Sequence, residues 1–384
     1  MAGGWASSAL FGGTLAERLA GIGDEVAGGG GRAAIYALAL RLIGERPWLG
    51  YGYGTFERIF TMAREPEFHV VYDHAESSWL ELVVDLGLPI AALFALAMLL
   101  LAAMLLRGAL RRRRDRVLPL TALAVAVAAG VHAMVDFSLQ IPAVAVTFAA
   151  IAATGAAHVV PLRHMPPAGS VAIWSTARIA AVLLGALLLV LAVPYARATW
   201  HLAVGNSAFR LVAADEPVLP AVVERARGSR EAALAIHPTG RTWKELGMVE
   251  LYRARDPGLS WEQRQEALQR ARAHLRSGLA RDPADPAAWY RLALVETMRG
   301  RIEDAADALA LSWRTGPWEP ELAPARLRLA LLHWPHLTEE ARRRAGREFC
   351  ADPERAEQLR TWIAEAGLAA DPAVALSVIE CATQ

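Results

Sequence analysis

Four long apolar runs constrain the fold of this chain more than any other feature. They cover residues 88–106, 117–135, 141–160 and 171–195. As helices rising about 1.5 Å per residue, all four are long enough to cross a hydrocarbon core of roughly 30 Å. Helices of soluble proteins rarely stay apolar around the whole circumference for such a length. The sequence therefore predicts an all-α chain built on a polytopic membrane helix bundle.

The distribution of arginine predicts how the runs are oriented. Six arginines lie between Arg107 and Arg116, in the loop that joins the first two runs, and short basic loops stay in the cytoplasm. The next loop, residues 136–140, has no basic residue, and the third carries Arg163 and His164. We therefore expect everything before residue 88 and everything after residue 195 on the non-cytoplasmic side.

Composition divides the chain into four predicted domains. These are a Gly/Ala-rich segment (1–31), a polar loop (32–87), the four transmembrane helices (88–195) and a charged helical domain (196–384). The first segment lacks the basic start and apolar stretch of a signal peptide. Its placement outside the membrane therefore predicts that this chain is part of a longer protein with further spans upstream. The net charge of +1, with no basic surface interleaved with aromatics, argues against nucleic acid as a partner.

The C-terminal domain shows a repeating helical pattern. Trp, Leu, Gly or Ala, and Tyr recur in two first helices, and alanine-rich helices ending in Asp-Pro or Pro-Trp follow, at Trp243–Pro283 and Trp289–Trp318. This pattern resembles tetratricopeptide repeats, whose stacked helix pairs share one core. Its tryptophans are expected mainly in that core. The concave face of such a domain would bind either a partner protein or a glycan. Cys350 and Cys381 match no metal spacing, and form either a disulfide or two unpaired thiols.

Two groups of residues stand out in the polar loop. Residues 33–45 have a helical pattern that stops before Pro47, and Gly50, Gly52 and Gly54 follow. These glycines form either a structural turn or a backbone cradle for phosphate.

Asp73, His74 and Glu76 then precede a helix that Ser77 or Ser78 can cap, with Glu81 three residues after Ser78. This second group is either a polar capping region with Trp79 as an interfacial anchor, or a general base, because imidazole titrates near neutral pH. Asp73, His74 and Glu76 do not form a recognisable metal ligand set.

The same strings carry a family resemblance. The first string begins with Gly31-Arg32 and ends with RPWLGYGYGTF at residues 46–56, and the second, residues 74–89, reads HAESSWLELVVDLGLP. Both resemble hallmarks of the O-antigen ligase and polymerase family. The resemblance implies a multispan glycosyltransferase with a GT-C-like fold in the bacterial inner membrane, with the polar loop and the C-terminal domain in the periplasm. It implies transfer of a glycan from undecaprenyl diphosphate to lipid A core, a protein or a growing polymer, with no metal or other cofactor.

Residue by residue, the resemblance implies catalytic roles for Arg32 and His74. The second histidine of the family pattern falls on Glu76 and its asparagine on Ser77, so the chain departs from the pattern there. A carboxylate still accepts a proton from a hydroxyl, so the departure does not exclude activity. Since a guanidinium binds phosphate oxygens in a bidentate way, Arg46 is a further candidate for binding the donor.

Two further sets of residues are expected at the same site. Asp73 is expected to orient the imidazole of His74, and Ser77 is expected near the substrate. His132 and Asp136, four residues apart where the second run meets the outside, are either part of this site or a structural hydrogen bond that fixes a helix end.

Two functions fit these observations. The first is a membrane glycosyltransferase that takes a lipid-linked glycan donor and a glycan acceptor, with ligation and polymerisation both open. The second is a non-catalytic anchor that displays a repeat domain for assembly of envelope polysaccharide. The loop motifs favour the first function, and the repeat domain favours the second.

Overall fold

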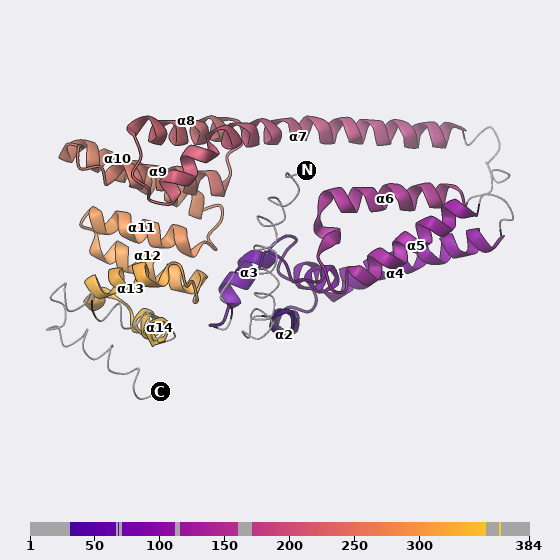
Figure 1. Ribbon diagram of the computed structural model, residues 1–384, viewed down its shortest axis with the longest axis horizontal. Helices are drawn as coiled ribbons and strands as arrows, with labels where there is room; N and C mark the ends of the chain where they lie inside the picture. Colours follow the sequence, from indigo (N-terminus) through magenta and orange to yellow (C-terminus); the bar gives the residue numbers. More distant parts are fainter. Residues whose placement is uncertain are drawn as a thin grey trace, which may run out of the picture. The chain divides into compact units, whose positions relative to one another are not determined.

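The computed structural model describes residues 31–159 and 171–350, except 67, 69–70 and 112–115, and also Thr361. Within these residues the chain is helical and contains no strand, which confirms the all-α prediction for this part. It divides into two compact units, Met1–Gly169 and Ser170–Gln384 (Figure 1). The four predicted domain ranges stay predictions.

The first unit contains a helical loop region followed by three apolar helices. Its elements are α2 (Arg32–Glu45), α3 (Phe56–Ala63), α4 (Ser78–Arg111), α5 (Val117–His132), the 3-10 helix η1 (Ser138–Gln140) and α6 (Pro142–Ala157). In Figure 1, α4, α5 and α6 run back and forth beside one another, and α5 contacts both of its neighbours. The expected helix before Pro47 is confirmed as α2, which ends at Glu45.

Two helices are long and apolar enough to cross a membrane. Among the described residues, these are α4 and the stretch Arg178–Ala213 of α7. The other two apolar runs form α5 and α6, each of 16 residues and therefore about 24 Å long. The second predicted run continues to residue 135, but α5 ends at His132, where a turn brings the Val135 N–H to the His132 carbonyl.

The second unit is a series of helical hairpins. It contains α7 (Val171–Ala213), α8 (Pro220–Ile236), α9 (Gly240–Ala254), α10 (Trp261–Leu279), α11 (Pro286–Met298), α12 (Ile302–Thr315), α13 (Ala323–Leu332), η4 (Trp334–His336) and α14 (Glu339–Cys350). The most extensive contacts join consecutive helices: α7 with α8, α9 with α10, and α11 with α12. The predicted boundary at residue 195 is not a helix end, because α7 continues to Ala213.

The tryptophans of this unit have mixed environments. Trp313 and Trp334 are buried in the largest apolar core, as predicted. Trp261 is 74% exposed, so the core assignment is wrong for that residue. Cys350 is disulfide-bonded, and the other cysteine of the chain, Cys381, lies outside the described residues.

A glycine break in α4 separates its polar start from its apolar run. Gly87 has φ 79° and ψ 169°, a backbone conformation that side chains with a Cβ rarely adopt. A Cβ on Gly87 would lie 2.3 Å from the Trp48 carbonyl oxygen. The loop of residues 46–54 therefore packs backbone against backbone on the break.

Replacing Gly87 by alanine is expected to destabilise the first unit by about 3 kcal/mol, from the left-handed backbone and the clash with Trp48 together. The matched control is Gly44→Ala in α2, where a Cβ would have no neighbour within 4 Å and alanine has the better helix propensity. Thermal unfolding in detergent measures the stability of both variants. Equal midpoints for Gly87→Ala and the wild type would contradict the account of the break.

Candidate functional site

A small aromatic core holds the polar loop in place. Phe56 and Phe60 from α3 pack with Phe68 and Tyr72, and the Phe60 and Phe68 rings meet edge to face with centroids 5.3 Å apart. The buried guanidinium of Arg64 donates to the Phe68 carbonyl from Nε and Nη2, at 2.9 and 2.7 Å. This core also includes buried α2 side chains, so it fixes the loop that precedes α4.

Glu81 holds the imidazole of His74. His74 Nδ1 lies 2.9 Å from Glu81 Oε1, and the Ala75 N–H donates to Oε2 at 3.1 Å. The Glu81 side chain is 5% exposed, whereas that of His74 is 35% exposed. In the described part of the chain no hydrogen bond engages His74 Nε2. A buried carboxylate thus orients a histidine whose second nitrogen is open to a substrate.

The start of α4 is docked on the end of α5. Ser78 donates from its backbone N to the carbonyls of Ala133 and Asp136, at 2.9 and 3.1 Å, and Trp79 Nε1 donates to Gly130 O at 3.0 Å. Ser77 caps α4, with its Oγ accepting the Leu80 N–H at 3.4 Å. Of the two capping serines that the sequence left open, the structure selects Ser77. Glu81 binds His74 and does not complete a capping box.

This docking brings the segment that follows α5 to His74. The ring of Phe137 stacks on the imidazole of His74, with centroids 4.4 Å apart and planes 15° from parallel. His132 Nε2 lies 3.6 Å from Asp136 Oδ2. The two residues do not share one helix, because α5 ends at His132, but the turn that follows still brings their side chains together.

Arg32, the first residue of α2, lies near Glu76, which follows His74 by two residues. Arg32 Nε is 4.0 Å from Glu76 Oε2, and the Arg32 side chain is 63% exposed. Glu76 has φ 54°, a left-handed backbone that is rare for a residue with a side chain, and the Tyr36 hydroxyl donates to its carbonyl at 3.0 Å. Such strain collects at functional sites when the surrounding structure holds it in place.

The glycine loop is a structural turn and not a phosphate cradle. Its amides at Tyr51 and Gly52 donate to the carbonyls of Val84 and Asp85, at 2.9 and 2.8 Å, and the Gly54 N–H donates to Asp85 Oδ2 at 2.7 Å. A Cβ on Gly50 would lie 2.4 Å from the Asp85 carbonyl oxygen. These amides already donate to Val84 and Asp85 of α4, so the phosphate interpretation is wrong for this loop.

Asp85 is a buried carboxyl that anchors this turn. It is 1% exposed and lies before Gly87, on the polar side of the break. Burial raises the pKa of Asp85 from 3.8 to about 6, the Gly54 N–H opposes that rise, and the nearby Glu81 adds to it. Its Oδ1 has no hydrogen-bond partner among the described residues.

The raised pKa predicts a pH-dependent stability. Above about pH 6, ionised Asp85 lowers the free energy of unfolding by roughly 3 kcal/mol at most. This penalty disappears as the pH falls from 6 toward 3.8. Asp85→Asn keeps an acceptor for Gly54 and removes the charge. The gain in unfolding midpoint of Asp85→Asn over the wild type should therefore be largest near pH 8 and shrink by pH 5. Parallel pH profiles for the two proteins would rule this out, and Asp73→Asn, an exposed carboxyl, is the control.

In the described part of the chain, neither Arg46 nor Asp73 hydrogen-bonds the imidazole of His74. Arg46 follows the 14-residue α2, about 20 Å along the helix from Arg32, and its guanidinium lies over the Tyr51 ring at 4.9 Å. Asp73 is exposed, and Glu81, not Asp73, orients His74. The role of Glu81 could have been inferred from its spacing: it lies one helical turn before Asp85, so both carboxylates face the polar loop.

Comparison with known proteins supports one family for this part of the chain. Residues 6–95 match a family model described as O-antigen ligase. The O-antigen ligase match is in keeping with the resemblance of the loop motifs and spans Arg32, His74, Glu76 and Glu81. It ends before His132 and Asp136, and it covers less than a third of the 384 residues. No curated protein and no solved structure matches the chain significantly.

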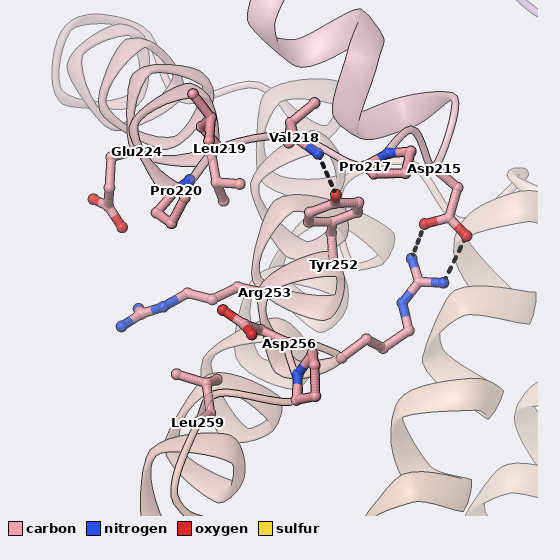
Figure 2. A pocket seen from close by; sticks show the side chains of 13 residues that line it. Asp215, Pro217, Val218, Leu219, Pro220, Glu224, Tyr252, Arg253, Asp256 and Leu259 are labelled. Carbon is pink, nitrogen blue, oxygen red and sulfur yellow. Dashed lines mark hydrogen bonds and ion pairs between the residues drawn. The ribbon is translucent and has the colours of Figure 1, made fainter.

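A second candidate site lies in the second unit, outside the O-antigen ligase match. A cleft of about 860 Å³ opens between the loop after α7 and the loop after α9 (Figure 2). Tyr252 stands at its centre and accepts the Val218 N–H at 3.3 Å, while Asp215 and Arg255 form a bidentate pair at 2.6 and 2.9 Å. Its walls mix prolines, aliphatic groups and both signs of charge, and they contain no nucleophile–base pair.

Proposed function

We propose that the chain transfers a glycan from an undecaprenyl diphosphate carrier to an acceptor hydroxyl at the outer face of a bacterial inner membrane. The observation that carries the proposal is the His74–Glu81 pair, and both this pair and the Arg32–Glu76 pair lie inside the O-antigen ligase match. The acceptor is lipid A core, a protein or a growing polysaccharide. Two helices able to span a membrane support the location.

His74 is the general base in this proposal. Its Nε2 takes the proton of the acceptor hydroxyl as the oxygen attacks the anomeric carbon of the donor sugar. Glu81, bound to Nδ1, fixes the tautomer and stabilises the imidazolium that forms. Phe137, in the segment after α5, stacks on the imidazole of His74 and fixes the plane of that ring.

Arg32 supplies charge for the leaving group. The bond between the anomeric carbon and the diphosphate oxygen breaks, and the negative charge on the released lipid diphosphate grows. Arg32 is the first residue of α2, where the helix dipole adds positive potential to its guanidinium. The 4.0 Å separation from Glu76 is loose enough for a phosphate oxygen to replace that carboxylate as the partner of Arg32.

Complementation tests the proposal. The full-length protein is expressed in strains that lack an O-antigen ligase or polymerase. We expect glycan on lipid A core, on protein or in longer chains with the wild type, and loss of that product with Arg32→Ala. Arg41→Ala, on the same helix but paired with Glu65, is the control that should retain it. Equal product from wild type and Arg32→Ala at matched expression would refute the role.

The second unit favours an additional or alternative role as a scaffold. Its consecutive hairpins and the cleft around Tyr252 form a surface of the kind that tetratricopeptide-like domains use to bind partners. A non-catalytic anchor would retain its function when His74 and Arg32 are both replaced by alanine. The same complementation assay therefore separates the two roles.

A further inference from the structure

The loop of residues 46–54 presents large apolar side chains that its own unit leaves uncovered. Trp48 is 72% exposed, Leu49 86% and Tyr53 72%. Large exposed apolar side chains gathered on one short loop indicate a contact surface. Residues 46–54 contain no acidic residue, and Arg46 lies over the ring of Tyr51.

Backbone hydrogen bonds fix the height of this loop along α4. Leu88 N donates to Pro47 O at 2.8 Å, and the Trp48 carbonyl abuts Gly87. Leu88 is the first residue of the apolar run, and its side chain, with those of Ile90 and Leu93, is exposed at 47, 47 and 62%. Trp48 and Leu49 are therefore continuous with the apolar surface of α4 at the level where that surface begins.

We propose that Trp48, Leu49 and Tyr53 form a membrane wedge that inserts into the headgroup and upper acyl region of the bilayer beside α4. Tryptophan and tyrosine are enriched at this depth, and an apolar tip buries roughly 5–10 Å into it. Three backbone hydrogen bonds join the neighbouring residues Pro47, Tyr51 and Gly52 to α4 around its break, so lipid contact by the wedge would hold the His74 loop at a fixed height above the membrane. The proposal rests on α4 spanning a bilayer, which is part of the proposed function.

Fluorescence quenching in vesicles tests the wedge. In a full chain with Cys350 and Cys381 replaced by serine, an NBD label is placed at Leu49→Cys, at Leu93→Cys as the span control, or at Glu57→Cys as the polar-loop control. The proteins are reconstituted in phosphatidylethanolamine and phosphatidylglycerol vesicles with doxyl-labelled lipid or with aqueous iodide. We expect doxyl lipid to quench the label at residue 49 roughly twofold more than at residue 57, and iodide to do the reverse.

Three results would overturn the wedge. A label at residue 49 that behaves like the one at residue 57 lies in water. A label at residue 49 that neither quencher reaches is covered by protein, from another span or a second copy. If doxyl lipid does not quench the label at residue 93, α4 does not span the bilayer, and the proposed location of the enzyme is wrong as well. Unfolding midpoints of the labelled proteins, matched to the unlabelled chain, exclude misfolding as the cause.

Discussion

Replacing His74 by alanine is expected to lower the rate of glycan transfer at least about a hundredfold, the lower end of what a positioned general base contributes. The variant should still fold, because the His74 side chain is 35% exposed and Glu81 keeps the Ala75 N–H as a donor. Transfer is measured with the full-length protein at matched expression. His158→Ala, whose imidazole only bonds the Thr154 carbonyl in α6, is the control and should transfer normally.

Glu81 extends this prediction to a residue that does not touch the substrate. Glu81→Leu removes the acceptor of His74 Nδ1, and we expect a loss of roughly tenfold or more, with a changed pH–rate profile. The rate losses from substituting residues that act as a unit are not additive. The His74→Ala/Glu81→Leu double variant should therefore transfer glycan no more slowly than His74→Ala alone. A double variant that multiplies both losses would show that Glu81 acts independently of the imidazole.

In the second unit, Arg326→Met is expected to cost about 3–5 kcal/mol of folding free energy, because it leaves a buried charge without its partner. Arg326 is fully buried and forms an ion pair with Glu348, which also accepts the Trp313 Nε1–H at 2.8 Å. Arg326 Nη1 donates to the Gly316 carbonyl at 2.7 Å as well. The group therefore ties α12, α13 and α14 together.

The cost of Arg326→Met is read from denaturant or thermal unfolding of the whole chain. Arg343→Met, which breaks an exposed pair with Glu339 on α14, should change stability by less than about 0.5 kcal/mol. Arg326→Met/Glu348→Leu should recover part of the loss, because no uncompensated carboxylate remains. A loss for Arg326→Met no larger than for Arg343→Met would contradict the buried network.

Local patterns predicted much of the fold. The apolar runs gave helices, and Pro47 ended α2 where expected, because periodicity and proline act within a few residues. The end of α5 and the continuation of α7 to Ala213 were missed. The first depends on the docking of Ser78 onto Ala133 and Asp136, more than fifty residues away, and the second on packing against α8.

The site was predicted in part. His74 and Glu76 are two residues apart in sequence, and Arg32 of α2 lies near Glu76 because Tyr36, one helical turn further along α2, donates to the Glu76 carbonyl. Glu81 was interpreted as a capping residue because the capping pattern fits it equally well. Only the left-handed backbone of Glu76 and the fold of the loop turn the Glu81 carboxylate toward the imidazole. Phe137 could not be assigned, because stacking on His74 depends on the docking of two distant segments.

Transfer of a labelled glycan in proteoliposomes tests the central claim most directly. The purified full-length protein is supplied with an undecaprenyl diphosphate-linked, radiolabelled glycan and an acceptor, and the label on acceptor and on carrier is followed over time. We predict that the wild type moves the label to the acceptor with release of the lipid diphosphate, and that His74→Ala leaves it on the carrier. Label that stays on the carrier with the wild type, or that moves equally fast with His74→Ala, would contradict a transferase centred on His74 and Glu81.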